Sequence, residues 1–391
     1  MRTKMIHTAL ACALLAMTAT GCSKTLKAEP KTPAKLVQIQ APMTVLQLQL
    51  EQRLDTDGKI PRSLKLNKKM TTDLQVATHG DVFFAASEGG VVSAINATGK
   101  LWSIAVKDAI TSAVALSLDG KVAVVGTHSG KVVALDANNG NVLWAKSLPT
   151  VSYTPALVSS NRVLLSGNNG TLYGLDRATG DVVWQFDTQF STLGIIGAAK
   201  PIAIDRDTAV FGTTDGRIHA LNIQTGVPMW TRAVGMAAGG SMTDHLKDVD
   251  AMPLVVGSRL YVTSFSGPFV GFDMTTGQKM FAKPIKSLTT PTHLGGMIVV
   301  TSTSGDVTAF NAITGDVLWE NKELKYRKLT NPVAIGNYIV VGDFEGVIHI
   351  FDTSGKIISR EKSKGRLTSL QSNQNRLYTQ TQAGVVNVWR F

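Results

Sequence analysis

One short segment returns at intervals along the chain, and this recurrence constrains the fold more than any other feature. Its clearest copy, Gly170–Trp184, reads G-T-L-Y-G-L-D-R-A-T-G-D-V-V-W. A turn glycine opens each copy, an apolar run follows, and a second turn leads to a strand with Trp or Phe in most copies. The copies are spaced by 38 to 51 residues, and their turn glycines are Gly90, Gly130, Gly170, Gly216, Gly267, Gly305, Gly346 and Gly384.

Each copy has the composition of a small antiparallel sheet. Asn-Gly and Gly-Asn turns supply the positive φ that a tight hairpin needs. The Asp-x-x-Thr-Gly segment makes a second turn, in which Asp or Asn caps the turn amides. The Trp that follows is a large apolar side chain able to pack between neighbouring sheets. A further short run precedes several hairpins and is begun by proline at Pro155, Pro201, Pro253 and Pro332.

Four strands in one copy cannot bury their own apolar faces, so the copies must stack on one another. We therefore predict an all-β fold, an eight-bladed β-propeller of four-stranded antiparallel blades over residues 43–391. The eighth copy ends with the chain at Phe391, before its outer strand. The alternating segment Leu46–Leu50 can supply that strand. We expect the ring to be closed by pairing this N-terminal strand with the C-terminal blade, which removes an exposed edge.

The first residues predict export and a lipid anchor. Residues 1–21 have a basic start and a short apolar run, as a secretory signal peptide does. They end in Ala-Thr-Gly before Cys22, which resembles the lipobox of bacterial lipoproteins, although Ala19 stands where leucine is usual. The resemblance implies lipidation of Cys22, and Ser23 in place of Asp implies the outer membrane, facing the periplasm. An ordinary signal peptide with an incidental cysteine is the alternative.

The segment after the anchor has the composition of a spacer. Residues 22–42 are rich in lysine and proline, and we expect a flexible tether there. Cys12 belongs to the removed segment, so the mature chain has no second cysteine with which Cys22 could form a disulfide. Removal of residues 1–21 lowers the formal net charge from +11 to +9, because Arg2 and Lys4 are lost. This charge indicates either a solvated basic surface or an anionic neighbour such as lipid headgroups or an acidic protein.

The repeat resembles the PQQ-like repeat of quinoprotein alcohol dehydrogenases. Together with the lipobox-like ending, the short tether and eight copies, the chain resembles the BamB family of lipoproteins, which belong to the Bam complex for outer membrane protein assembly. The resemblance implies a scaffold without catalytic residues that binds the periplasmic domains of the barrel subunit. It also implies assistance in folding and inserting β-barrel outer-membrane proteins, whose unfolded chains are further candidate partners.

Two loops are similar to partner-contact loops of that family. The acidic segment before Pro253 carries Asp248 and Asp250, and the apolar segment before Pro201 carries Leu193, Ile195 and Ile196. The family has Arg where this chain has Ile196. Loops that enter the first strands of neighbouring blades should emerge on one rim, so an apolar loop beside an acidic one is a candidate partner surface. Alternatively, the apolar side chains fold down onto the propeller and the two carboxylates cap turns.

A quinoprotein-like or other ligand-binding propeller is the rival hypothesis. Such enzymes usually carry a vicinal disulfide over the cofactor, and this chain has no Cys-Cys pair. We expect no catalytic residues, no cofactor, no metal and no nucleic acid partner. His219 and His349 occupy one repeat position that holds other residue types elsewhere, which indicates a structural position. Exposed strand edges that bind extended client segments by β-augmentation are a further hypothesis.

Overall fold

The computed structural model describes residues 31–54, 74–188, 199–234, 248–265 and 267–391. The chain divides into two units, Met1–Thr32 and Pro33–Phe391, and the account below concerns the second unit. All of the regular secondary structure in the described ranges is β-strand. Those ranges accordingly contain no helix that is long and apolar enough to cross a membrane.

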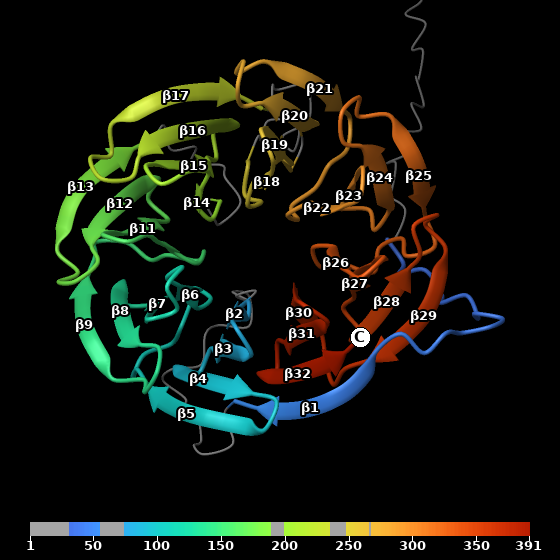
Figure 1. Cartoon of the computed structure of the whole chain (residues 1–391), viewed down its shortest axis with the longest axis horizontal. Helices are drawn as coiled ribbons and strands as arrows, with labels where there is room; N and C mark the ends of the chain where they lie inside the picture. The colour runs from blue at the N-terminus through green and yellow to red at the C-terminus, as the bar shows by residue number, and fades with distance from the viewer. Residues whose placement is uncertain (1–30, 55–73, 189–198, 235–247, 266) are drawn as a thin grey trace, which may run out of the picture. The chain divides into compact units, whose positions relative to one another are not determined.

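Eight four-stranded antiparallel sheets, the blades, form a ring (Figure 1). In blades 1 to 7 the strand that comes first in the chain lies nearest the centre. Blade 1 consists of β2 (Ala77–His79), β3 (Val82–Ala86), β4 (Val91–Asn96) and β5 (Gly99–Ala105), and blade 2 of β6 (Ala115–Leu116), β7 (Val122–Gly126), β8 (Lys131–Asp136) and β9 (Val142–Ser147). Blade 3 consists of β10 (Leu157–Val158), β11 (Arg162–Ser166), β12 (Thr171–Asp176) and β13 (Val182–Asp187), and blade 4 of β14 (Ile202–Ala203), β15 (Thr208–Gly212), β16 (Arg217–Asn222) and β17 (Pro228–Ala233). Blade 5 consists of β18 (Leu254–Val256), β19 (Arg259–Val262), β20 (Phe269–Asp273) and β21 (Lys279–Lys283). Blade 6 consists of β22 (Thr292–Leu294), β23 (Met297–Thr301), β24 (Val307–Asn311) and β25 (Val317–Asn321), and blade 7 of β26 (Val333–Ile335), β27 (Tyr338–Gly342), β28 (Val347–Phe351) and β29 (Ile357–Lys362). The predicted eight-bladed propeller is confirmed.

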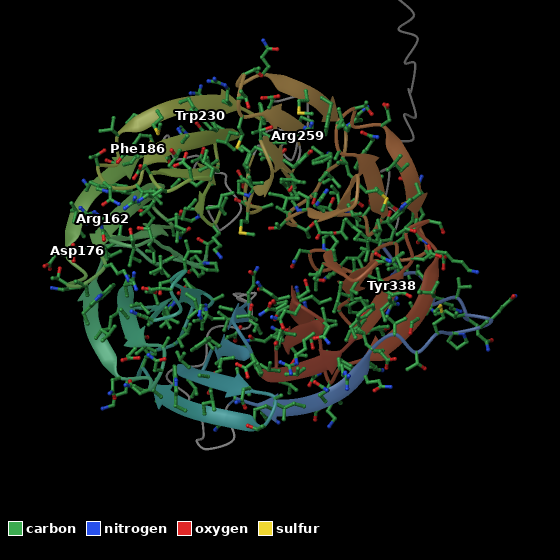
Figure 2. The ribbon with its side chains drawn as sticks, viewed as in Figure 1. Arg162, Asp176, Phe186, Trp230, Arg259 and Tyr338 are labelled. Carbon is green, nitrogen blue, oxygen red and sulfur yellow. The ribbon has the colours of Figure 1, made fainter. Side chains whose placement is uncertain are left out.

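Blade 8 joins the two ends of the fold, as predicted. Its strands β30 (Leu367–Asn373), β31 (Arg376–Thr381) and β32 (Val385–Arg390) come from the C-terminus, and β1 (Gln47–Arg53) is the outer strand (Figure 1). The β1–β32 pairing is antiparallel, with Gln47 opposite Arg390 and Arg53 opposite Val385. The last residue, Phe391, packs edge-on against Tyr338 of blade 7 at 5.6 Å between ring centroids, and Figure 2 labels Tyr338.

The turn chemistry explains why each repeat folds into the same hairpin. In blade 3, Asp176 Oδ1 accepts hydrogen bonds from the backbone N–H groups of Ala178 at 2.9 Å and Thr179 at 3.0 Å. The turn then closes at Gly180, whose φ of +76° favours glycine. On the other side of this hairpin, Arg162 lies 3.4 Å from Asp176, and both are labelled in Figure 2. The capping residue predicted from the sequence therefore has a direct structural role.

Three of the repeated tryptophans join neighbouring blades. Trp144 of blade 2 donates an indole hydrogen bond of 2.8 Å to the carbonyl of Arg177, in a turn of blade 3. Trp102 and Trp184 make the equivalent bonds to the next blade, to Ala137 at 3.0 Å and to Ile223 at 3.2 Å. Each indole therefore joins two sheets through both its apolar ring and its N–H group.

The segment before β1 lies against blade 7. Ala34 N–H donates to the carbonyl of Lys325 at 2.9 Å, and Met43 N–H donates to the carbonyl of Ile358 at 3.0 Å. The second unit accordingly begins at Pro33, within the segment that the sequence analysis assigned to a tether ending at residue 42. Composition did not indicate this contact, because apart from Ile39 the segment is held through its backbone groups. For residues 22–30, which lie outside the described ranges, the tether stays a prediction.

Candidate partner-binding rim

The two loops singled out in the sequence lead into neighbouring blades. Ala199–Pro201 precedes β14 of blade 4, and Asp248–Pro253 precedes β18 of blade 5. The two blades share an apolar core in which Val210 and Ile218 of blade 4 pack with Leu260 of blade 5. Of the predicted contact residues, Asp248 and Asp250 belong to the described part of the chain. The remaining predicted site residues lie outside it: Cys22, Leu193, Ile195 and Ile196.

The acidic loop is pinned between the two blades by its central valine. Val249 is fully buried in the shared core, and its N–H donates to the carbonyl of Thr213 in blade 4 at 3.2 Å. On the other side, the carbonyl of Asp248 accepts a bond of 3.0 Å from the N–H of Phe265 in blade 5. A Cβ atom at Gly212 would lie 2.4 Å from Val249 Cγ1, so glycine is required for this approach. The two carboxylates thus flank an inward-pointing apolar anchor.

The two aspartates of this loop have different environments. Asp248 is fully buried, whereas Asp250 is only partly buried. Burial, followed by the nearby charge of Asp248, raises the pKa of the Asp250 carboxyl to about 8. Among the described residues, no group donates a hydrogen bond to either carboxyl oxygen of Asp250. Because both oxygens are buried, an arginine, lysine or amide donor of a partner would reach and satisfy them only if the loop opened.

The sequence did not indicate that Asp248 would be buried. In an extended segment, residues two apart lie on the same side, so an inward Val249 predicts two outward carboxylates. The structure covers Asp248 because the loop runs between the turns of blades 4 and 5. Direct contact with a partner by either aspartate stays a prediction, since both carboxyl oxygens of Asp250 are also buried.

A cavity of about 680 Å³ lies among the inner strands of blades 1 to 4. Its walls include apolar side chains of β6, β10 and β14, and Lys200 at the entrance to β14 contributes a charged group. Burial lowers the pKa of the Lys200 ammonium below its ordinary value. No residue in the described ranges forms a salt bridge with it. A buried amine beside an apolar wall is a feature expected of a site for small organic anions, because a bound anion would favour its protonated form.

The paired histidine position holds two packed side chains. His219 stacks on Phe211 at 5.5 Å between ring centroids, and its Nδ1 lies 3.0 Å from the hydroxyl of Thr231. His349 Nε2 lies 3.1 Å from Asp343 Oδ2. Figure 2 labels Phe186, which also packs edge-on against His219 at 5.5 Å. Within the described residues, no group of three His, Cys, Asp or Glu side chains could hold a metal ion.

Comparison with known proteins places the chain in one family. The family model described as outer membrane protein assembly factor BamB matches residues 87–321 and 303–391. The chain is 28% identical to outer membrane protein assembly factor BamB of Yersinia pestis over 327 residues, which cover 80% of this chain and 83% of that protein. It is 30% identical to the protein of the same name from Escherichia coli K12 over 328 residues, with coverage of 81% and 83%. The crystal structure of BamB from Moraxella catarrhalis has 46% sequence identity and a TM-score of 0.82, and the match covers 89% of this chain and 100% of that chain.

Proposed function

Because the chain belongs to the BamB family of outer membrane protein assembly factors, we propose that it is a non-catalytic scaffold of the outer-membrane protein assembly complex. In this role it binds the periplasmic domains of the barrel subunit and assists the folding and insertion of β-barrel outer-membrane proteins. The observation that supports the proposal is the similarity to the Moraxella catarrhalis BamB structure over 89% of this chain at 46% identity. The proposed location is the outer membrane, facing the periplasm, with lipid attached at Cys22.

The proposed contact surface is the rim formed by the loops before β14 and β18. Asp250 supplies a carboxyl group that lacks a donor among the described residues. Asp248 acts mainly by raising the pKa of Asp250, since its own side chain is buried. Leu193, Ile195 and Ile196 supply the apolar part of the surface. With Ile196 in the place of the family's arginine, the apolar contribution would be larger in this chain.

Co-purification from detergent-solubilised envelopes tests the rim assignment. The native chain should bring down a large barrel protein, and Asp250→Lys and Leu193→Asp should each reduce the yield at least about tenfold. Asp81→Lys is the matched control, because Asp81 is exposed in the turn between β2 and β3, at the opposite end of its blade. Circular dichroism establishes that each variant is folded. If all variants retain the barrel protein, the rim is wrong and the scaffold role stands.

If even the native chain fails to retain a barrel protein, the scaffold role itself is contradicted. The lipid proposal has its own measurement. Mass spectrometry of the N-terminal peptide should show acylated Cys22 in the native chain, and palmitate labelling should disappear in Cys22→Ser. An unmodified peptide that begins elsewhere would contradict the anchor while leaving the rim untouched.

Unfolded barrel proteins are the proposed clients, and the outer strands are candidate sites for them. Pairs of apolar side chains on these edge strands are exposed by about half: Val142 and Leu143 of β9, Val182 and Val183 of β13, and Val317 and Leu318 of β25. An extended client strand could pair with such an edge through backbone hydrogen bonds. Crosslinking from Leu143 to an unfolded barrel protein would test this, with exposed Asp81 in the turn between the inner strands β2 and β3 as the control position.

A small-ligand-binding propeller is the second candidate, and the cavity beside Lys200 favours it. Absorbance and native mass spectrometry of the purified full chain provide the test. A bound quinone or another organic anion that is lost in Lys200→Met would support this function. A chain of unmodified mass with no visible absorbance would leave the scaffold as the better account.

A further inference from the structure

The segment Pro33–Met43, here called the strap, is held on blade 7 by two arginines. Arg327 Nη1 donates a hydrogen bond of 2.9 Å to the carbonyl of Ala34. Arg360 Nη1 donates to the carbonyl of Val37. Both bonds are made to backbone carbonyls, so the arginines hold the path of the strap independently of its side chains.

The two arginines belong to one buried network. Arg327 Nε donates to Asp343 Oδ2 at 2.6 Å, and the same oxygen lies 3.1 Å from His349 Nε2. The other ring nitrogen of His349 accepts a bond of 3.1 Å from Arg360 Nε. A chain of hydrogen bonds therefore runs from Ala34 through blade 7 and back to the strap at Val37. Such a closed polar network holds the strap more firmly than isolated surface contacts would.

The strap presents apolar side chains to solvent. The exposed fractions of Leu36, Val37 and Met43 are 36%, 57% and 51%. Only Ile39 of this segment packs against the core cluster of blades 6 and 7. An extended segment that is anchored by its backbone and directs apolar side chains outward needs an apolar environment to cover them.

Exposed lysines lie at the end of the strap that contains Ala34. Lys35 is exposed on the strap, and Lys325 and Lys328 are exposed on the turn to which the strap bonds. Among the described residues, none of these three ammonium groups has a carboxylate partner. Glu345 on this side is engaged by Arg327, and the exposed carboxylate of Glu323 lies close enough to Arg360 to favour its charged form. These lysines therefore place positive charge near Leu36 and Val37 at this end of the strap.

The chain between the predicted anchor and the strap is short. Ten residues separate Cys22 from Pro33, and a fully extended chain covers about 3.3–3.6 Å per residue, so the strap begins at most about 40 Å from the lipid. We propose that the strap and the turn Lys325–Lys328 form a membrane-binding surface for anionic phospholipids, in which the lysines contact headgroups and Leu36, Val37 and Met43 enter the interface. That the strap lies near a membrane rests on the lipid anchor of the proposed function. The apolar and basic side chains of the surface are a property of the strap and its neighbouring turn.

A lipid surface fits these features better than a folded protein partner does. Exposed apolar side chains next to lysines match the composition of interfacial membrane segments. Each lysine near an anionic leaflet adds attraction that depends on salt. This membrane contact, added to the lipid at Cys22, would also orient the ring. It would bring blade 7 toward the membrane and leave the other blades free for partners.

Vesicle binding of the unlipidated chain tests the surface without the anchor. The probe is the mature chain from residue 22 with Cys22→Ser, mixed with vesicles of phosphatidylethanolamine and phosphatidylglycerol at a ratio of about 3:1, or with phosphatidylcholine alone. We expect binding to the anionic vesicles, weakened at least about tenfold in the variant Lys35→Glu/Lys325→Glu/Lys328→Glu. The matched control is Lys107→Glu/Lys121→Glu/Lys279→Glu, three exposed lysines of blades 1, 2 and 5 with the same change of charge. Equal loss in both variants would reduce the effect to net charge and overturn the proposal.

An environment-sensitive fluorophore gives an independent readout of position. In the Cys22→Ser chain no other cysteine remains, so Val37→Cys and Val142→Cys can each be labelled uniquely. A blue shift on anionic vesicles is expected at residue 37 and not at residue 142, which is similarly exposed on blade 2. A shift at both positions, or at neither, contradicts a membrane-facing strap. Because neither assay needs acylated Cys22 or the barrel subunit, failure here leaves the proposed function intact, and failure of co-purification leaves this surface intact.

Discussion

His349 accepts a hydrogen bond of 3.1 Å at Nδ1 from the guanidinium of Arg360. Because an arginine N–H can only donate, Nδ1 carries no proton, and Nε2 must carry the proton that it donates to Asp343 at 3.1 Å. The ring is therefore neutral in the folded protein. Burial, the largest influence, lowers the pKa of His349 below its ordinary value in spite of the nearby carboxylate.

This tautomer predicts a loss of stability in mild acid. A folded-state pKa below about 6.5 means that the unfolded chain takes up the proton first, so the free energy of unfolding falls as pH drops below about 6.5. The contribution of one such group is at most about 1.4 kcal/mol per pH unit. His349→Gln should make the slope between pH 7 and pH 5 shallower in urea titrations. His128→Gln, at an exposed histidine of blade 2, should keep the native slope, and an unchanged slope in His349→Gln would contradict the neutral ring.

The Asp343 carboxylate should be among the most sensitive positions of blade 7. Arg327 is 3% exposed and Asp343 is fully buried, so Asp343→Ala leaves a guanidinium with less compensation in a low-dielectric site. Removing one partner of a buried pair costs about 3–5 kcal/mol, which denaturant unfolding measures directly. Asp181→Ala is the control, because it breaks an exposed pair with Lys146 of 2.7 Å and should leave the urea midpoint unchanged. Equal effects of the two substitutions would mean that the Arg327 site is solvated.

The sequence predicts the ring well because its information is local and repeated. The caps such as Asp176, the positive-φ turns such as Gly180 and the prolines before inner strands each specify one step of one blade, and eight repetitions reinforce the reading. Closure by the segment around Leu48 follows from simple counting, because one strand is missing at one end and one unpaired alternating run is present at the other.

Prediction from the sequence fails where distant segments are joined only by backbone hydrogen bonds or by the burial of a side chain. Nothing in the lysine- and proline-rich strap indicates that Arg327, almost 300 residues later, donates to its backbone. The burial of Asp248 depends on the loop's path between the turns at Thr213 and Phe265, which belong to two different repeats. Within the repeat pattern, Asp343 and His349 occupy ordinary positions, and only the addition of Arg327 and Arg360 turns them into a network.

Ring closure should depend on one leucine. Leu46 is 2% exposed and packs with Leu370 and Trp389 between blades 7 and 8. Leu46→Ala removes buried methyl groups and should lower the free energy of unfolding by about 2–5 kcal/mol. Leu48, two residues later in β1, is 50% exposed, so Leu48→Ala should cost less than about 1 kcal/mol. Similar costs in urea unfolding would indicate that β1 is held by backbone pairing alone.

The junction between blades 2 and 3 should not accept a methyl group at Gly180. A Cβ there would lie 2.5 Å from Trp144 Cε3, and φ is +76°. Gly180→Ala therefore combines backbone strain with displacement of the indole, and we expect a loss of about 2–4 kcal/mol in thermal or urea unfolding. Gly257→Ala separates the two effects, because its φ is +58° but no atom lies within 4 Å, so about 1 kcal/mol is expected. If Trp144→Leu does not relieve the cost of Gly180→Ala in the double variant, the indole is not the cause.

The last prediction concerns the pKa of Asp250, which is raised to about 8. Between the ordinary pKa of about 4 and this value, the folded chain binds a proton that the unfolded chain has lost, so stability falls as pH rises, by at most about 1.4 kcal/mol per unit. Asp250→Asn stays neutral and should lack this decline. The difference in unfolding free energy between Asp250→Asn and the native chain should therefore grow in favour of the variant from pH 5 to pH 8.

Asp81→Asn, at an exposed aspartate, controls for the loss of a carboxyl group and should follow the native curve. Parallel curves for Asp250→Asn and the native chain would show that Asp250 is already ionised in the free protein. In that case a partner's cation would find a charged carboxylate at neutral pH. If the decline is present, a cationic partner group must instead displace the proton, and binding at the rim should strengthen from pH 6 to pH 8 in the native chain but not in Asp250→Asn.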